Sequence, residues 1–187
     1  MAAIVNGLSL PKLRAFGTTF FIFSGYARPA IRLSALMDLP TIFVFTHEAM
    51  GDGEDGPTHQ PVEQLVSLRA IPGLFVLRPA DANEVVEASR YILQLHRPAV
   101  LALSRQPLPT FDLGTYASAT GVARGAYVMA DAPGGAPEII LIASGSQVAL
   151  VVEAHEALVA KGIRLQRKYG FEPDKVVAAA LEMLGCK

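Results

Sequence analysis

The stretch "GTTFFIFSGYARPAIRLSALMDLPTIFVF", residues 17–45, decides the fold class. Its two ends, GTTFFIF (17–23) and TIFVF (41–45), are rich in β-branched and aromatic residues and predict strands. Between them YARPAIRLSALM (26–37) has helical periodicity, and Pro29 suits a helix only if it lies in the first turn. A strand, a helix and a second strand in this order predict a parallel pair with a right-handed crossover.

The same alternation continues along the chain. LFVL (74–77) and AVLALS (99–104) predict two more strands. The helix between them has its own start signal, because Asp81 can act as N-cap and Glu84 follows three residues later. Repeated strand–helix units predict an α/β fold, a parallel-sheet domain with helices on both faces.

A second unit follows a loose connection. Residues 106–137 are rich in Pro, Gly, Ala and Thr, which is typical of a segment between domains. PEIILIAS (137–144) then predicts a buried strand, Ser146 can cap a helix that Gly162 can end, and IRL (163–165) predicts the start of another strand.

We expect two domains, one at residues 1–124 and part of a second α/β domain at residues 125–187. After Leu165 the character of the sequence changes abruptly. The segment QRKYGFEPDKVVAAALEMLG predicts a loop and a terminal helix. One and a half strand–helix units cannot close a domain, so we expect a missing segment after Leu165.

Composition excludes several functional classes. The formal net charge is −1 and the 16 basic residues are scattered, which argues against nucleic acid or an acidic membrane surface as a partner. The apolar runs fall short of the roughly 20 residues that cross a bilayer, and the first residues do not resemble a secretory signal. Cys186 is the only cysteine, so an internal disulfide is impossible and a reducing, cytoplasmic setting fits.

Polar and aromatic residues follow each predicted strand of the first domain. In an open parallel sheet, ligands bind beyond the carboxyl ends of the strands, so these residues should meet at one edge. They are Phe23 and Tyr26 after the first strand, His47 to His59 after the second, Arg78 and Asp81 after the third, and Ser104 and Arg105 after the fourth.

The loop FTHEAMGDGEDGPTHQP, residues 45–61, concentrates proton carriers and glycines. Gly51, Gly53 and Gly56 indicate backbone that turns tightly or approaches a ligand, and long loops in compact α/β domains are often functional. His59 and Asp55 lie four residues apart before the predicted helix PVEQLVSLRA (61–70), an arrangement suited to general acid and base chemistry.

Other interpretations of these residues remain open from the sequence. The aromatic residues 20–26 can simply fill the core, and Arg105 can cap a helix or make a surface pair. Capping and turn chemistry accounts for Arg78 and Asp81.

Metal binding by this chain is not expected. The acids of the loop do not keep the register of a calcium-binding loop, and His47 and His59 are twelve residues apart rather than at zinc-ligand spacing. "GDG" (51–53) also occurs in the metal and diphosphate motif of thiamine-diphosphate enzymes, but that motif needs an Asn pair downstream that this chain lacks.

Taken together, these segments resemble a known family. FTHEAMGDGEDGPTHQPVEQLVSLRAIPGLFVLRPADANE (45–84), with residues 17–40 before it and PAVLALSRQ (98–106) after it, resembles transketolase in its pyrimidine-binding domain. Residues 137–165 resemble the beginning of the C-terminal domain of that family, and YGFEPDKVVAAALEML (169–184) resembles its last helix. The most specific part is GEDGPTHQPVEQ.

The resemblance implies roles for individual residues. The aminopyrimidine ring of thiamine diphosphate is expected against Phe20, Phe23 and Tyr26, with Phe23 as the stacking ring. The ketose and its phosphate are expected to contact four further residues. Of these, His59 exchanges a proton with the carbonyl-derived oxygen, Asp55 binds a hydroxyl, and His47 and Arg105 hold the phosphate.

Partners and limits also follow from the resemblance. Sugar phosphates are the expected substrates, and the active site is expected at the interface of a homodimer whose other subunit gives the diphosphate domain. Mg or Ca would be bound through the diphosphate by a part of the enzyme absent here. The family's activating glutamate falls just before the segment matching residues 1–7, so we expect this chain alone to be inactive.

Two alternatives stay open. One is a related enzyme of the dihydroxyacetone synthase or 1-deoxyxylulose-5-phosphate synthase type. The other is a non-catalytic split subunit that completes the site of a partner chain.

Overall fold

The computed structural model describes residues 1–49, 55–132, 136–161 and 165–166. The chain forms two compact units. Unit 1 comprises Met1–Pro79 and Ala88–Pro107, and unit 2 comprises Ala80–Glu87 and the described part of the chain from Leu108 onward. Helix α4 (Ala82–Leu95) begins in unit 2 and ends in unit 1.

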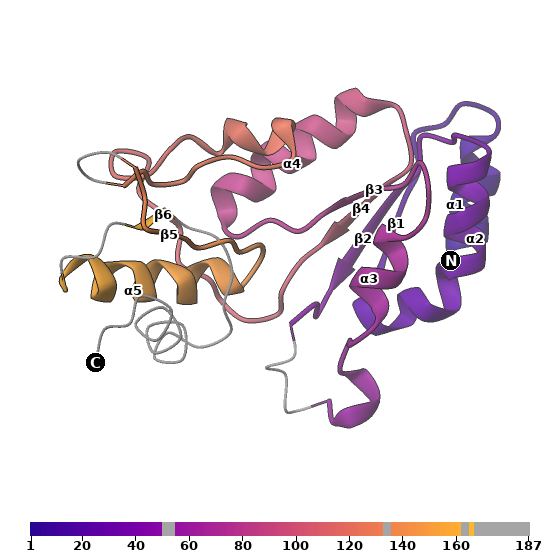
Figure 1. Cartoon of the computed structure of the whole chain (residues 1–187). Helices are drawn as coiled ribbons and strands as arrows, with labels where there is room; N and C mark the ends of the chain where they lie inside the picture. Colours follow the sequence, from indigo (N-terminus) through magenta and orange to yellow (C-terminus); the bar gives the residue numbers. More distant parts are fainter. Residues whose placement is uncertain (50–54, 133–135, 162–164, 167–187) are drawn as a thin grey trace. The chain divides into compact units, whose positions relative to one another are not determined.

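Unit 1 is built on a four-stranded parallel sheet with the order β1-β2-β4-β3 (Figure 1). The strands are β1 (Phe16–Phe20), β2 (Ile42–Thr46), β3 (Phe75–Leu77) and β4 (Ala99–Ala102). Every residue of the central strand β4 is buried, and in β2 the side chains of Phe43 and Phe45 are 0% exposed, as expected for a parallel sheet covered on both faces. The predicted α/β fold class is confirmed.

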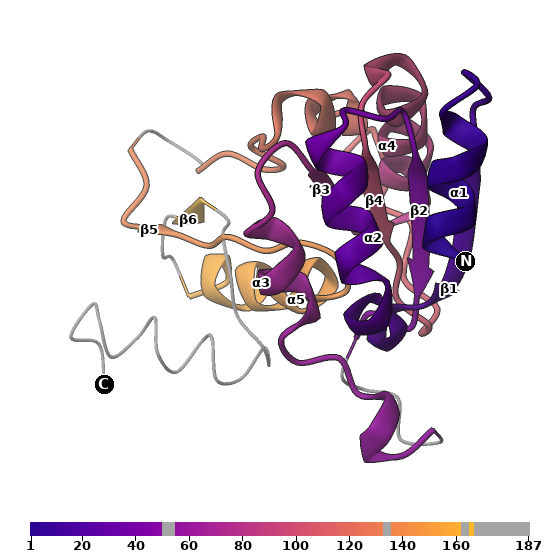
Figure 2. The same ribbon diagram turned by 90° about the vertical axis from the view of Figure 1, so that its right-hand side faces the viewer.

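Helices cover both faces of this sheet. On one face lie α1 (Ala2–Ser9), α2 (Ser24–Leu36) and α3 (Gln64–Arg69), and α2 contacts both of the others. The part of α4 that belongs to unit 1 lies on the opposite face (Figures 1 and 2). Its inward side chains, Ala88 and Ile92, are at most 2% exposed, so this helix closes the second side of the core.

The first strand is shorter than the sequence predicts. β1 ends at Phe20, and Phe21–Phe23 form a single 3-10 turn, η1, that leads directly into α2. Phe21 is 1% exposed and its ring lies 5.8 Å from that of Phe45, so burial of this side chain fixes the turn. Strand propensity of an aromatic run is overridden here by the tertiary contact.

The prediction that Pro29 lies in the first helical turn is wrong. α2 begins at Ser24, two residues before the predicted start, so Pro29 lies inside the helix. A proline there cannot donate to the carbonyl four residues earlier. That carbonyl belongs to Gly25, which is exposed, so water can hydrogen-bond to it.

Unit 2 contains a second parallel pair, β5 (Ile139–Ile140) with β6 (Leu165–Gln166), and helix α5 (Gln147–Val159). β5 is much shorter than the predicted strand at 137–144, because its ladder with β6 is only two residues long in the described part of the chain. The core beside α5 consists of Leu141, Val151, Ala154 and Leu158.

The two caps predicted in unit 2 differ. Ser146 occupies the N-cap position of α5, as predicted, but its side chain makes no capping hydrogen bond. Asp81 is confirmed as the cap of α4, because Glu84 N–H donates to Asp81 Oδ1 at 2.9 Å. Gly162, predicted to end α5, lies outside the described residues.

Gly17 controls how closely α1 approaches β1. A Cβ built at Gly17 would lie 2.3 Å from Met1 Sδ and 2.9 Å from Val5 Cγ2, whereas one at Gly7 in α1 would meet nothing within 4 Å. We expect Gly17→Ala to lower the free energy of unfolding by about 1–3 kcal/mol through overpacking. The matched variant Gly7→Ala should raise it by about 0.5–1 kcal/mol, because alanine favours helix over glycine.

Urea unfolding of both variants checks this prediction. A Gly17→Ala protein as stable as the parent would show that α1 and β1 are not closely packed at this position.

Candidate active site

Five rings meet at the carboxyl edge of the sheet, and we call them the ring cluster: Phe20, Phe23, Tyr26, His47 and His59. The parallel pairing of β1 with β2 places Phe20 opposite Thr46, so the next residue, His47, reaches the Phe20 ring. These two rings stack with centroids 3.8 Å apart at an angle of 25°. His59 stands edge-on, 5.4 Å from Phe23 and 6.3 Å from Phe20.

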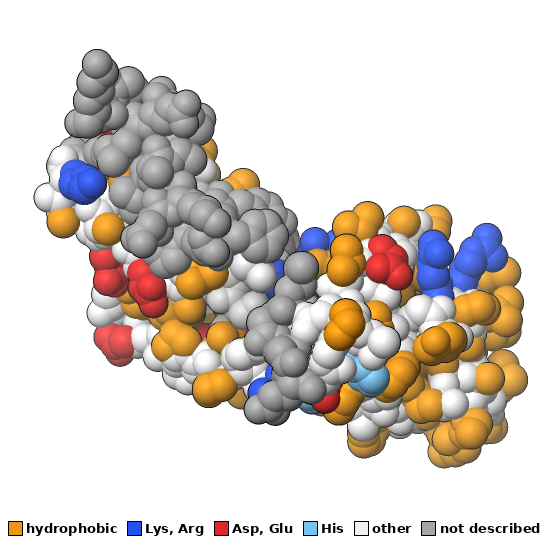
Figure 3. Space-filling view, turned by 90° about the horizontal axis from the view of Figure 1, so that it is seen from below, with side chains coloured by type: hydrophobic (Ala, Val, Ile, Leu, Met, Phe, Trp, Pro, Cys, Tyr) orange, Lys and Arg blue, Asp and Glu red, His pale blue; other side chains and the backbone are white. Residues whose placement is uncertain are grey.

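The cluster offers aromatic surface to solvent. Phe23 is 36% exposed and Tyr26 is 86% exposed, and their rings are stacked 6.3 Å apart. The face of unit 1 seen in Figure 3 shows histidine side chains among hydrophobic ones. Exposed rings of this kind fit a flat heteroaromatic ligand, whereas a core aromatic residue would be covered.

His47 has an unusual backbone conformation, with φ +61°, directly after β2. This left-handed region is uncommon for a residue with a side chain and persists where the surroundings enforce it. The ring is oriented by a 2.9 Å hydrogen bond between Nδ1 and Thr46 Oγ1. Its Nε2 lies 3.9 Å from Asp55 Oδ2, and the partial exposure of both side chains makes this a weak, screened attraction.

His59 is placed by a glycine-dependent turn. Gly56 has φ 70° and ψ −177°, a conformation essentially restricted to glycine, and it precedes the 3-10 turn η2 (Pro57–His59). His59 N–H donates to the Gly56 carbonyl at 3.2 Å. The imidazole Nδ1 lies 2.9 Å from Thr58 Oγ1, which fixes the ring and directs Nε2 away from that contact. The other two glycines of the loop, Gly51 and Gly53, lie outside the described residues.

Arg105 is exposed and lies outside the ring cluster. It is nevertheless at the same edge, because it follows β4, the neighbour of β2. Glu48 N–H donates to the Leu103 carbonyl at 3.1 Å, which ties the backbone after β2 to the backbone after β4. The ring cluster therefore brings together five of the seven predicted site residues, and Asp55 lies next to His47. Arg105 follows β4 at the same edge, outside the cluster.

A buried ion pair behind the cluster was missed by the sequence analysis. Arg78 Nε lies 2.6 Å from Glu48 Oε2, and the two side chains are 8% and 5% exposed. The interpretation of Arg78 by turn chemistry is therefore wrong, while that of Asp81 holds. Burial raises the pKa of Glu48, and the hydrogen bond and charge of Arg78 and the charge of Arg69 partly oppose that rise. No sequence pattern signals this pair, because its members are thirty residues apart.

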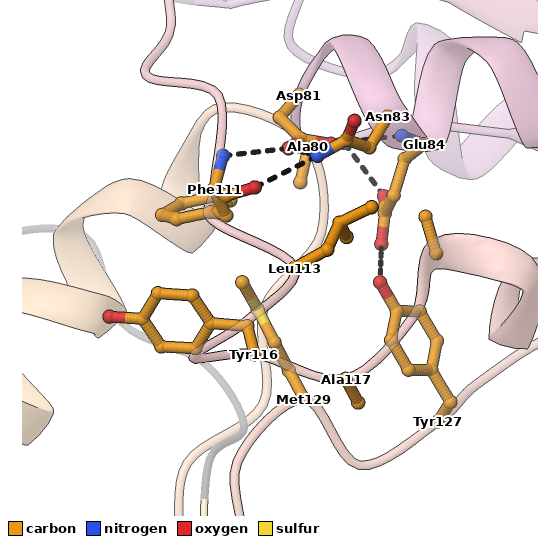
Figure 4. A pocket seen from close by; sticks show the side chains of 11 residues that line it. Ala80, Asp81, Asn83, Glu84, Phe111, Leu113, Tyr116, Ala117, Tyr127 and Met129 are labelled. Carbon is orange, nitrogen blue, oxygen red and sulfur yellow. Dashed lines mark hydrogen bonds between the residues drawn. The ribbon is translucent and has the colours of Figure 1, made fainter.

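Unit 2 has a small pocket of its own beside the start of α4 (Figure 4). Asp81 Oδ2 accepts Phe111 N–H at 3.0 Å, and the Tyr127 hydroxyl donates to Glu84 Oε1 at 2.7 Å. Burial raises the pKa of Tyr127, and its hydrogen bond to Glu84 raises it further. Asp81, Asn83 and Glu84 hydrogen-bond to Phe111 and Tyr127 in Figure 4, so these contacts attach the segment after Leu108 to the start of α4.

Among the residues that the structure describes, no three His, Cys, Asp or Glu side chains gather as a metal site. In the same residues, no helix has the length and apolarity to cross a bilayer.

The fold and the edge cluster define the class of protein, a parallel α/β domain with exposed rings at the carboxyl ends of its strands, which is where open parallel sheets bind ligands. Residues 1–110 match the family described as "Transketolase, pyrimidine binding domain", and residues 125–166 match the "Transketolase-like TK C-terminal domain". The chain belongs to the transketolase family, with the pyrimidine-binding domain and part of the C-terminal domain.

Similar proteins agree with this assignment. A transketolase of Halalkalibacterium halodurans is 56% identical over 165 residues, which are 87% of this chain and 25% of that protein. The chain thus spans about a quarter of the length of the curated relatives it matches.

Solved structures extend the comparison. A Campylobacter jejuni transketolase has a TM-score of 0.82 at 40% identity and is covered over 26% of its length, against 89% of this chain. A Pichia stipitis transketolase in complex with sedoheptulose 7-phosphate has a TM-score of 0.80 at 40% identity, over 89% of this chain and 24% of that one. A protein described as a split gene transketolase, inactive β4 tetramer, has a TM-score of 0.69 at 25% identity, over 88% of this chain and 51% of that one.

The left-handed backbone at His47 can be tested by a pair of substitutions. We expect His47→Gly to be more stable than His47→Ala by about 1 kcal/mol. Both variants lose the ring contact with Phe20, but only alanine keeps a Cβ at this φ. The same pair at Thr18, an exposed residue of β1, should rank in the opposite order, because glycine weakens a strand.

Urea unfolding compares the two pairs. Equal stabilities for the two His47 variants would mean that the backbone relaxes there once the imidazole is removed.

Proposed function

We propose that this chain supplies the pyrimidine side of a transketolase active site, in which a two-carbon ketol unit passes from a ketose phosphate to an aldose phosphate. The observation that carries the proposal is the ring cluster at the carboxyl edge of a sheet that belongs to the pyrimidine-binding-domain family. Thiamine diphosphate is the proposed cofactor.

The exposed rings fit the cofactor's aminopyrimidine. One face of Phe20 is occupied by His47 at 3.8 Å, so Phe23 and Tyr26 have more aromatic surface to offer. We assign stacking to Phe23, with Phe20 and Tyr26 lining its flanks. When bound, thiamine diphosphate supplies the carbon–carbon bond chemistry, and the protein orients the reactants. Mg or Ca would come with the diphosphate and be held by a part of the enzyme outside this chain.

Proton exchange is assigned to His59. Its Nδ1 is engaged by Thr58, so Nε2 is the atom that exchanges a proton with the substrate's carbonyl-derived oxygen. An imidazole nitrogen can both accept and donate a proton, which suits both directions of this transfer. Asp55, 35% exposed and beside His47, is assigned to a substrate hydroxyl as a hydrogen-bond acceptor.

His47 and Arg105 are assigned to the sugar phosphate. Arg105 is exposed at the edge next to β2, where its guanidinium can hold two phosphate oxygens. The complex of the Pichia stipitis transketolase with sedoheptulose 7-phosphate supports a sugar phosphate as ligand of this fold.

The remaining assignments concern the whole enzyme. We place the domain boundary at residue 124, with a segment missing after Leu165, and the active site at the interface of a homodimer. A chain that gives only the pyrimidine side cannot bind the diphosphate, so these 187 residues alone should not turn over. The single cysteine, Cys186, suits a cytoplasmic enzyme.

A second candidate is a subunit of a split enzyme. The likeness to the split gene transketolase, of which this chain covers 51%, favours it. In that case the chain contributes its ring cluster to a site completed by a different polypeptide. Co-purification with a second chain that binds the diphosphate would support this candidate, and a single polypeptide of the relatives' length would remove it.

A chimera tests the proposed function. The matching segment of the Halalkalibacterium halodurans transketolase is replaced by this chain's residues, and ketol transfer to ribose 5-phosphate is measured with thiamine diphosphate present. We expect activity, and a fall in kcat/KM of about 10²–10⁴-fold for His59→Ala, because the proton carrier is lost. His96→Ala, at an exposed position before β4, is the control and should remain active.

The preferred acceptor substrate distinguishes a transketolase from the two related types of enzyme. Preference for formaldehyde or pyruvate would replace the proposal by a dihydroxyacetone synthase or 1-deoxyxylulose-5-phosphate synthase type of enzyme. A folded chimera that is inactive with every acceptor would contradict the proposal.

Arg105 gives a separate prediction. In the same chimera, Arg105→Gln should raise KM for the phosphorylated sugar by about 10–100-fold, because a charge-assisted contact is lost. KM for the same sugar without its phosphate should not change. Arg32→Gln, on the exposed side of α2, is the control. An equal rise for both sugars would exclude a phosphate contact.

A further inference from the structure

Glu48 and Arg78, which we call the buried pair, lie at the ends of two strands that are not neighbours. Glu48 is two residues beyond β2 and Arg78 follows β3 directly, while β4 lies between these strands in the sheet. The 2.6 Å contact of Arg78 Nε with Glu48 Oε2 therefore bridges the carboxyl ends of β2 and β3 across β4. Neither residue has a role in the proposed chemistry.

Stability alone is a poor explanation for the buried pair. Two charges that are more than nine-tenths buried lose their hydration, and replacing such a pair by apolar residues is often neutral or stabilising. The rise in the pKa of Glu48 indicates that burial outweighs the help from Arg78 and Arg69. We therefore looked for an influence of the pair on neighbouring residues of the site, and His47 is the residue next to Glu48.

That effect falls on His47, the residue next to Glu48 in the chain. Glu48 is held at both ends, because its N–H donates to the Leu103 carbonyl at 3.1 Å and its carboxylate contacts Arg78. Because Glu48 is fixed, the chain changes direction after β2 at His47, whose φ is +61°. A left-handed non-glycine residue persists only when its surroundings hold it there, and the fixed neighbour Glu48 is part of the surroundings of His47.

We propose that Glu48 and Arg78 are positioning residues that hold the backbone of His47 in its left-handed conformation and thereby keep the imidazole stacked on Phe20. They act through His47 and do not touch a ligand. The positioning of His47 is independent of the proposed function. The binding of a sugar phosphate by His47 rests on the proposed function.

NMR of the 187-residue chain tests the positioning directly. The ring of Phe20, stacked at 3.8 Å, should shift the imidazole protons of His47 upfield, and the 13Cα shift of His47 reports its positive φ. The double variant Glu48→Met with Arg78→Met replaces the pair by apolar side chains of similar length. We expect it to unfold at the parent's urea midpoint or above, yet to lose both His47 signatures.

The matched control is the exposed ion pair of Arg97 and Asp38, whose Nε and Oδ1 are 3.0 Å apart and whose side chains are 43% and 61% exposed. Asp38→Asn should leave both His47 signatures unchanged. If the double Met variant does not fold, Arg78→Lys takes its place, because it keeps the charge and loses the Nε contact. The same loss of signatures is then expected.

The outcomes separate this inference from the proposed function. A folded variant that retains both His47 signatures overturns the positioning role, whatever the enzyme does. Loss of the signatures establishes it even if the chimera is inactive, because the measurement uses neither sugar nor cofactor. If the chimera is active, the same substitutions should raise KM for the phosphorylated sugar more than they lower kcat, and an unchanged KM would contradict a link through His47.

Discussion

The parallel pairing of β1 with β2 is the constraint on which the candidate site depends. Its register sets Phe20, the last residue of β1, opposite Thr46, so that His47, the residue after β2, stacks on the Phe20 ring. The turn at Gly56 then brings His59 edge-on to Phe20 and Phe23. A shift of this register by one residue would turn the side chains of one strand to the opposite face of the sheet, and the rings of the cluster would no longer be in contact.

The edge has two layers with different chemistry. Outside lie the partly exposed rings, to which the proposed function assigns a flat cofactor and a polar sugar. Inside lie Glu48 and Arg78, two charges whose burial is costly and whose contact spans β4. The left-handed backbone of His47 joins the two layers, because one side of this residue is the exposed stack and the other is the fixed peptide of Glu48.

Much of this arrangement could be predicted from local sequence. The strands of unit 1 and the cap at Asp81 follow from short-range patterns, and the structure bears them out. The failures share a cause in distant contacts. β1 stops at Phe20 because Phe21 is buried against Phe45, and Arg78 was misinterpreted because its partner is thirty residues away.

The sequence by itself determined the order of strands and helices, the α/β class and the membership of the transketolase family, because periodicity, caps and the GEDGPTHQPVEQ segment are local properties. Only the tertiary structure decided the strand order β1-β2-β4-β3, the stacking of His47 on Phe20 and the ion pair of Glu48 with Arg78. These features join residues far apart in the chain, and their energies depend on burial and on register. Neither quantity exists until the sheet has formed.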